Sequence, residues 1–188
     1  GALIINNKKY RKRAEIVWEK GTNRIQYYKG EVNKYTWVDI GSSYLPSELV
    51  AAYLLSQIRK VDEINKLRMS VWDKYNKLFT NKLYSNSFKI PYVPENCSHN
   101  AHMFYLILNS QKERDNLIYK MKKININPVF HYIPLHSSPA GKKYGKVGSK
   151  MTITNDISKK ILRLPLYPEL SKSKAKLIHN KIIKLLNI

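Results

Sequence analysis

Apolar residues recur every three or four positions in several segments of the chain, and this spacing places them on one face of an α-helix. The longest pattern predicts a helix over residues 46–79, with a break or bend near Asp62. The pattern of residues 8–20 ends at Gly21, because glycine readily adopts the left-handed conformation that closes a helix. Further helices are expected at residues 111–123, 157–162 and 172–186.

Short apolar runs alternate with these helices and predict extended strands. They cover residues 2–6, 88–93, 102–108 and 128–134, with a short extended piece at 163–166. The apolar residues of segment 22–44 recur with no regular spacing, so a loop is expected there. A loop of this length inside a domain usually carries a function or an interface. A lysine-rich loop around Gly141, Gly145 and Gly148 is expected to be mobile. The order of elements predicts an α/β chain whose C-terminal part is α+β, a small antiparallel sheet covered by helices.

The composition favours a folded domain over a disordered segment. The chain has 188 residues, a hydrophobic fraction of 43% and 14 tyrosines, which is enough apolar surface to bury a core. No apolar run approaches the roughly 18 residues that a membrane-spanning helix needs. The single cysteine, Cys97, excludes an internal disulfide and fits a reducing cytoplasm.

The net charge of +21 raises nucleic acid as a partner. However, 27 of the 34 basic residues are lysine. Base-edge recognition favours arginine, whose planar guanidinium donates two hydrogen bonds at once. The lysines are also scattered along the chain. These observations weigh against nucleic-acid binding as the primary role.

Residues 20–49 form the most informative run, KGTNRIQYYKGEVNKYTWVDIGSSYLPSEL. Gly41, Ser42 and Ser43 stand shortly before Pro46, where the long helix is predicted to begin. The first N–H groups of a helix lack partners and carry the positive end of its dipole, so this run suits a phosphate group. A plain N-cap for the helix is the alternative.

Three further segments complete a family pattern. They are residues 99–105 (HNAHMFY), 129–136 (VFHYIPLH) and 163–171 (RLPLYPELS). Together with residues 20–49 they resemble the pyridoxal-phosphate-dependent nucleotide-sugar aminotransferases of the DegT/DnrJ type. The resemblance extends over the whole chain.

The resemblance implies that the chain is the C-terminal portion of a fold-type I aminotransferase. Residues 1–45 are then a remnant of the large cofactor-binding domain, 46–80 the connecting long helix and 81–188 the small domain. Members of the family are roughly twice this length, a large domain plus a small one. The lysine that forms the Schiff base with the cofactor is therefore expected before Gly1. No catalytic residue is assigned within the chain, and the chain alone is expected to be catalytically silent.

The resemblance also implies a reaction and its partners. An amino group would pass from glutamate to the 4-keto carbon of a dTDP-4-keto-6-deoxysugar, with pyridoxal 5′-phosphate as cofactor, in a cytoplasmic homodimer. The product would serve cell-surface polysaccharide synthesis, such as lipopolysaccharide or enterobacterial common antigen. Three alternatives stay open: an inactive remnant, a half-protein that complements or dimerises with a separate N-terminal half, and a basic nucleic-acid-binding module.

In the family, the loop matching Ser42 and Ser43 crosses the dimer interface and contacts the cofactor phosphate of the partner subunit. Many members have asparagine at the position of Ser43, and serine has a shorter reach. Arg24, Lys34 and Tyr35 lie in the preceding segment, where an arginine can hold a diphosphate or a donor carboxylate. A surface ion pair is the alternative for Arg24.

His131 and Tyr132 are expected to contact the substrate, with His136 behind them, since the family's HYxPLH segment lines the mouth of the sugar-nucleotide pocket. A structural histidine is the alternative for each imidazole. No metal site is expected. His99, His102, Cys97 and Glu95 lie near one another in sequence, but the set is poor for zinc, which is usually held by three or four thiolate or imidazole ligands.

Overall fold

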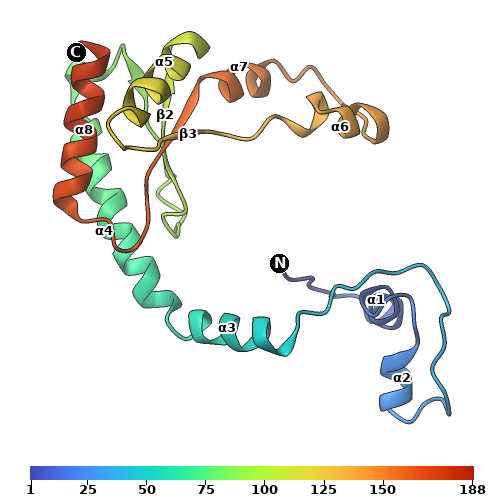
Figure 1. Ribbon diagram of the computed structural model, residues 1–188. Helices are drawn as coiled ribbons and strands as arrows, with labels where there is room; N and C mark the ends of the chain where they lie inside the picture. Colours follow the sequence, from blue (N-terminus) through green and yellow to red (C-terminus); the bar gives the residue numbers. More distant parts are fainter. The chain divides into compact units, whose positions relative to one another are not determined.

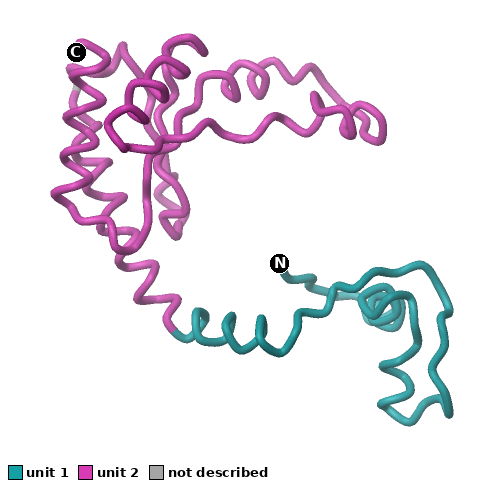
Figure 2. The backbone as a smooth tube through the Cα atoms, viewed as in Figure 1, with its two compact units in different colours: residues 1–59 teal, residues 60–188 magenta. Residues whose placement is uncertain are grey.

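The computed structural model describes residues 1–188, apart from the side chain of Lys82. The chain divides into two compact units, residues 1–59 and 60–188 (Figure 2). This division falls inside the segment that the sequence predicts as one long connecting helix. The partition into 1–45, 46–80 and 81–188 stays a prediction.

The first unit is helical (Figure 1). Its elements are a short 3₁₀ turn η1 (Lys8–Tyr10) and the helices α1 (Arg11–Trp18), α2 (Arg24–Tyr28) and α3 (Glu48–Ile58). The helix predicted over residues 8–20 is present but shorter, because residues 8–10 form the 3₁₀ turn η1 and α1 ends at Trp18. Gly21 follows with a φ of +77°. Helix α2 was not predicted because five residues are too few to show a period.

The strand predicted at residues 2–6 is wrong. These residues pair with no strand in the described part of the chain, and Leu3 and Ile4 are 79% and 83% exposed. An apolar run becomes a strand only where a neighbour receives its backbone hydrogen bonds.

The segment predicted as one helix is two. Helix α3 ends at Ile58, and α4 (Val61–Phe79) begins after Lys60, whose φ of −108° and ψ of 10° are not helical. The break therefore lies close to the expected position. Asp62 and Glu63 occupy the first turn of α4, where carboxylates interact favourably with the helix dipole.

The second unit contains the small antiparallel sheet that the sequence predicts, and the structure shows four strands in the order β1-β2-β4-β3. The strands are β1 (Phe88–Lys89), β2 (Phe104–Leu108), β3 (Val129–Phe130) and β4 (Ile161–Leu164). Both β2 and β3 pair antiparallel to β4, so they run in the same direction. Helix α5 (Gln111–Lys122) connects them as a crossover around the intervening strand.

Several predicted boundaries in this unit are wrong. The strands predicted at residues 88–93 and 128–134 are only two residues long, because β1 ends at Lys89 and β3 at Phe130. The predicted helix at residues 157–162 is displaced: α7 spans Thr152–Lys160, and Ile161 and Leu162 belong to β4 instead, where they pair with β2. The lysine-rich loop contains a 3₁₀ turn η3 (Leu135–Ser137) and a short helix α6 (Pro139–Tyr144), which Ser138 caps. A further 3₁₀ turn, η2, spans Lys82–Tyr84.

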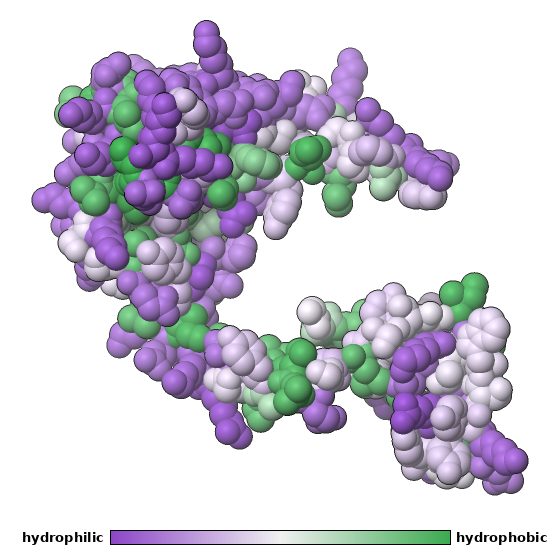
Figure 3. Space-filling model, viewed as in Figure 1, coloured by the Kyte–Doolittle hydropathy of each residue, from purple (hydrophilic) through white to green (hydrophobic). Residues whose placement is uncertain are grey.

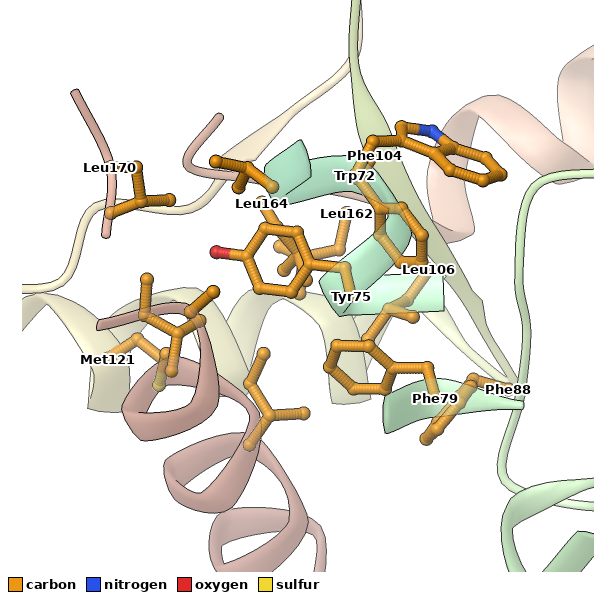
Figure 4. Close-up of a cluster of buried hydrophobic side chains, with 14 of the residues drawn as sticks. Trp72, Tyr75, Phe79, Phe88, Phe104, Leu106, Met121, Leu162, Leu164 and Leu170 are labelled. Carbon is orange, nitrogen blue, oxygen red and sulfur yellow. The ribbon is translucent and has the colours of Figure 1, made fainter. Parts of the chain in front are cut away.

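One face of the sheet forms the core. Phe104, Leu106 and Leu108 alternate with half-buried residues along β2 and are at most 2% exposed. They pack with Tyr75 and Phe79 of α4 (Figure 4). Helix α8 (Lys172–Leu186), predicted with these bounds, lies beside α4 on the same face. Each fully buried side chain of this size contributes about 1.5–3 kcal/mol to folding.

Helix α3 contrasts with this core, because it has no buried residue. Leu49, Tyr53 and Ile58 are 84%, 71% and 56% exposed. Figure 3 shows the apolar surface over this helix. Within the described residues, no helix is both long and apolar enough to cross a membrane.

Candidate functional site

The candidate residues fall in both units. In the first unit, the loop that carries Ser42 and Ser43 folds back against the end of α1. The carbonyl oxygen of Gly21 accepts hydrogen bonds from the N–H groups of Val38 and Asp39, at 2.8 and 3.0 Å. A Cβ on Gly41 would overlap the backbone nitrogen of Gly21. Glycine at positions 21 and 41 therefore lets the turn after α1 and the loop before Ser42 bring their backbones into contact, which a residue with a Cβ would prevent.

This packing sets the position of Ser42 and Ser43. The N–H of Ser42 donates to the Val17 carbonyl at 3.0 Å, and its carbonyl accepts from the N–H of Lys20 at 3.1 Å. Both serines are exposed. Among the described residues, neither hydroxyl has a hydrogen-bond partner, so both can donate to a ligand.

The serines do not adjoin the helix N-terminus that the sequence predicts for them. Helix α3 begins at Glu48, and Ser47 caps it by accepting from the N–H of Val50 at 3.4 Å. The N-cap interpretation of Ser42 and Ser43 is therefore wrong, because five residues separate Ser42 from the helix that they were expected to precede. Their capacity to hold an anion depends on the hydroxyl groups and the loop.

Arg24 is held inside the first unit. It donates from Nε and Nη2 to the Tyr28 hydroxyl, at 3.1 and 2.9 Å, and from Nη1 to Glu19 Oε1 at 3.3 Å. The hydrogen bonds to Tyr28 raise the pKa of Arg24. Its guanidinium also lies 5.8 Å from the ring centre of Tyr35, whereas Lys34 is exposed. Arg24 therefore forms an ion pair, which was the alternative to a ligand contact. The pair differs from an ordinary surface pair because the Glu19 side chain is buried.

In the second unit, His131 and Tyr132 line a cleft of about 710 Å³. The cleft lies between the start of α5, the segment after β3, and α7. Its lining residues are Gln111, Arg114, Asp115, Phe130, His131, Tyr132, Ile133, Pro134, Ser137, Asn155, Ser158 and Lys159. His136 is not among the lining residues, but its Nε2 lies 2.8 Å from Oδ1 of the lining residue Asn155.

The imidazole of His131 has an unusual environment. Its Nδ1 is buried and has no hydrogen-bond partner within the described chain. Burial lowers the pKa of His131, and the charges of Arg163 and His102 lower it further. The ring is therefore neutral near pH 7 and keeps one nitrogen available to accept a hydrogen bond.

Two arginines near this segment were not predicted as site residues. Arg163 on β4 has a buried Nε without a partner in the described structure. Arg114 is 7% exposed and lies with its guanidinium carbon 5.7 Å from the ring centre of Phe130. The sequence carried a signal for Arg114: it shares the buried stripe of α5 with Leu117 and Met121, where a charged residue is rare.

His99, one of the two histidines weighed for zinc, has structural contacts. His99 Nδ1 accepts from the N–H of Ala101 at 3.2 Å, and its ring packs edge-on against Trp72 at 4.5 Å. No group of three or more histidine, cysteine or carboxylate side chains converges in the part of the chain that the structure describes.

Comparison with known proteins gives a family match over nearly the whole chain. Residues 1–183 match the model of the DegT/DnrJ/EryC1/StrS aminotransferase family. UDP-4-amino-4-deoxy-L-arabinose--oxoglutarate aminotransferase of Shewanella sediminis is 26% identical over 142 residues, 72% of this chain and 37% of that protein. dTDP-3-amino-3,6-dideoxy-alpha-D-galactopyranose transaminase of Aneurinibacillus thermoaerophilus is 23% identical over 92% of this chain and 43% of its own length.

The fold matches as well. A DegT DnrJ EryC1 StrS aminotransferase from Brucella abortus superposes with a TM-score of 0.78 at 22% identity, over 98% of this chain and 46% of that structure. The chain thus spans about half the length, or less, of the relatives it matches.

Proposed function

The chain belongs to the DegT/DnrJ/EryC1/StrS aminotransferase family, and on this premise we propose that it supplies the C-terminal half of a pyridoxal-phosphate-dependent nucleotide-sugar aminotransferase. The observation that carries the proposal is the family match across residues 1–183. The chain spans about half of each relative, so the activity is assigned to a protein that contains this chain together with the rest of the fold.

The proposed reaction moves an amino group from glutamate to the 4-keto carbon of a dTDP-4-keto-6-deoxysugar. The name of the Aneurinibacillus relative contains a dTDP-linked amino sugar, which supports the nucleotide. The name of the Shewanella relative contains oxoglutarate, the keto acid that glutamate leaves behind, which supports the donor. That relative uses a UDP-linked sugar by name, so UDP is the competing nucleotide. A role in cell-surface polysaccharide synthesis is part of the proposal.

Pyridoxal phosphate supplies an electron sink for such a transfer when it is bound. Ser42 and Ser43 fit its phosphate, because their hydroxyls are exposed and have no partner among the described residues. The backbone bonds of Ser42 to Val17 and Lys20 hold the loop in place while the hydroxyls donate. We assign the two serines to the cofactor of a partner subunit in a homodimer, and we assign no catalytic residue within residues 1–188.

The substrate contacts are proposed from the second unit. Tyr132 is 77% exposed at the cleft and offers a ring and a hydroxyl, and His131 offers a neutral imidazole. His136 positions Asn155 through their 2.8 Å contact. Lys34 and Tyr35 are exposed and able to meet a ligand, whereas Arg24 acts mainly by holding its own unit together.

The exposed apolar face of α3 supports the idea that further protein covers this helix in the complete enzyme. Leu49 and Tyr53 are 84% and 71% exposed, and apolar surface of this kind marks an interface. We propose that the occupant is the remainder of the aminotransferase fold, in the same polypeptide or in a complementing one. The exposed thiol of Cys97 supports a reducing, cytoplasmic setting.

The test uses the reading frame that encodes this chain together with whatever precedes Gly1. The expressed protein is incubated with pyridoxal phosphate, glutamate and a dTDP-4-keto-6-deoxysugar, and the amino sugar and oxoglutarate are quantified by mass spectrometry. We expect both products in equal amounts. Absence of product with dTDP-, UDP- and GDP-linked keto sugars alike would overturn the proposal.

Two controls sharpen the assay. Residues 1–188 alone should give no product under the same conditions, because the chain offers no assigned catalytic residue. Ser43→Ala in the longer protein should weaken cofactor retention, measured by absorbance after dialysis. Ser56→Ala serves as the matched control, since its hydroxyl donates only to the Tyr53 carbonyl of its own helix at 2.7 Å.

A further inference from the structure

The second unit has another cleft, which lies away from the candidate site and has a volume of about 670 Å³. Its walls are residues 124–127 before β3, the segment after β4, and helix α8, which is red in Figure 1. Because β3 and β4 are antiparallel, the start of β3 and the end of β4 lie at the same end of the sheet. His131 follows β3 and belongs to the opposite end. We call this second cleft the α8 groove.

The floor of the α8 groove is apolar. Leu170 and Ile178 line it and are buried members of the core. Ile124 and Leu177 line it as well, but they are 42% and 52% exposed. A ligand that covers these two side chains removes apolar surface from water, so the floor favours an apolar group as occupant.

Two lysines stand on either side of the apolar part of α8. Lys174 and Lys181 line the groove, and Leu177 and Ile178 lie between them in the sequence. Spacings of three, four and seven residues place all four on one face of the helix. Seven residues span about 10.5 Å along the helix axis, which is therefore the separation of the two cationic positions.

No carboxylate balances these lysines in the part of the chain that the structure describes. Neither the lining of the groove nor helix α8 includes an aspartate or a glutamate. The described ion pairs of this unit are made by Arg114 and Lys160. Lys181 is half-buried and still has no anionic partner among the described residues. The groove therefore complements a ligand that carries two negative charges.

The wall formed by residues 124–127 offers side-chain amides. Asn125 and Asn127 line the groove, and neither amide has a hydrogen-bond partner among the described residues. Each amide provides both donors and an acceptor. This combination matches the N–H and C=O groups that an extended peptide presents along its backbone.

We propose that the α8 groove binds an extended acidic segment of another protein, in which an apolar side chain stands between two carboxylates. In an extended peptide, residues i, i+2 and i+4 lie on one side, and the first and last are about 13 Å apart. The order acidic, any, apolar, any, acidic thus places the apolar side chain against Leu177 and the carboxylates within reach of Lys174 and Lys181. This interaction is separate from the aminotransferase reaction.

Other anionic occupants match the groove less well. A fatty acid has a single head group, whereas the two lysines stand at both ends of the apolar part. Single-stranded nucleic acid binds through phosphates and through bases that stack on aromatic side chains. The lining includes one aromatic side chain, Tyr167, and its floor is aliphatic.

A basic cleft elsewhere in this unit separates the proposal from diffuse attraction. Lys66, Lys74 and Lys77 of α4 and Lys172 of α8 line it, and Met69 is its one apolar residue. It has more lysines than the α8 groove but no apolar floor. A ligand drawn only by the net charge of +21 should therefore prefer this cleft.

Fluorescence anisotropy tests the proposal at about 0.15 M salt, where exposed charges are largely screened. The longer protein that contains residues 1–188 is titrated into the end-labelled peptide Gly-Glu-Thr-Leu-Thr-Glu-Gly. Two matched peptides carry serine in place of leucine, or glutamine in place of both glutamates. We expect the loss of leucine to weaken binding by about tenfold and the loss of both carboxylates by about fivefold.

Variants of the protein locate the site. Leu177→Ser and Lys174→Ala should weaken binding of the leucine peptide by about fivefold and threefold. Both residues are exposed, so neither variant disturbs the core. Lys77→Ala removes the same charge from the basic cleft and should change the dissociation constant by less than about 1.5-fold.

Three outcomes would overturn the proposal. Equal binding of the leucine and serine peptides, or equal losses in Lys174→Ala and Lys77→Ala, would show diffuse attraction. No binding of the leucine peptide would leave the groove without its proposed occupant. Decanoate that binds in its place, with a loss in Leu177→Ser, would assign the groove to a fatty acid. The assay needs neither the cofactor nor turnover, so its result is independent of the transaminase assay.

Discussion

Nη1 of Arg24 lies 3.3 Å from Oε1 of Glu19, and the Glu19 side chain is only 5% exposed. Lys20 Nζ approaches the same oxygen at 3.2 Å. A buried carboxylate needs such partners, because removing them leaves a charge with little water to solvate it. The residue that the sequence singles out as a substrate ligand is therefore first a support of the loop that carries Ser42 and Ser43.

Arg24→Ala should lower the melting temperature of the chain, because it removes a partner of the buried Glu19 carboxylate. Thermal unfolding followed by circular dichroism measures the effect. Lys34→Ala is the control, since an exposed lysine without described contacts changes stability by no more than about 0.5 kcal/mol. A melting temperature for Arg24→Ala equal to that of Lys34→Ala would show that Arg24 does not support the loop.

Gly41→Ala should destabilise the first unit by about 3 kcal/mol, since the added Cβ overlaps the Gly21 nitrogen and the Val17 carbonyl, which are backbone atoms. Gly148→Ala is the matched control, with no atom within 4 Å of the added carbon. Urea unfolding compares the two variants. A Gly41→Ala variant as stable as Gly148→Ala would contradict the close approach of the two turns.

Tyr75→Phe should cost about 1–2 kcal/mol, because the Tyr75 hydroxyl donates to the Pro165 carbonyl at 3.0 Å in a buried setting. Burial also raises the pKa of Tyr75, with a smaller contribution from Tyr167, so the hydroxyl stays protonated as a donor. Tyr119→Phe, at a 59% exposed position, is the control. Equal midpoints for the two variants in urea would argue against the Tyr75 hydrogen bond.

His131 should make stability depend on pH. Burial, Arg163 and His102 all lower its pKa from the ordinary value of 6.5, so between the folded and unfolded pKa values only the unfolded chain binds the proton. The contribution of His131 is then complete above about pH 6.5 and is lost as the pH falls below it. His131→Asn should flatten that part of the profile of melting temperature against pH.

An NMR titration provides the direct check on His131. The Cε1–H signal of His131, assigned by its absence in His131→Asn, should titrate with a midpoint below 6.5. A midpoint at or above 6.5 would contradict the buried, unpartnered Nδ1.

The sequence by itself determined the features that depend on local periodicity. The apolar stripe of α8 gave its bounds, because a helix must place its apolar residues on one face, and Phe104, Leu106 and Leu108 predicted a strand with one buried face. Gly21 marked the region where α1 ends, although the left-handed conformation there is shared by Lys20 and Gly21. The family pattern in residues 129–136 led to His131 and Tyr132, and the structure places both at a cleft.

Only the tertiary structure decided which residues meet across elements. Periodicity places Arg114 on a buried stripe, but its approach to Phe130 depends on how α5 crosses from β2 to β3. The assignment of Ile161 and Leu162 to β4 and the unpaired state of residues 2–6 likewise depend on neighbours far along the chain. Backbone hydrogen bonds and burial are settled by such neighbours, and local residue order does not specify them.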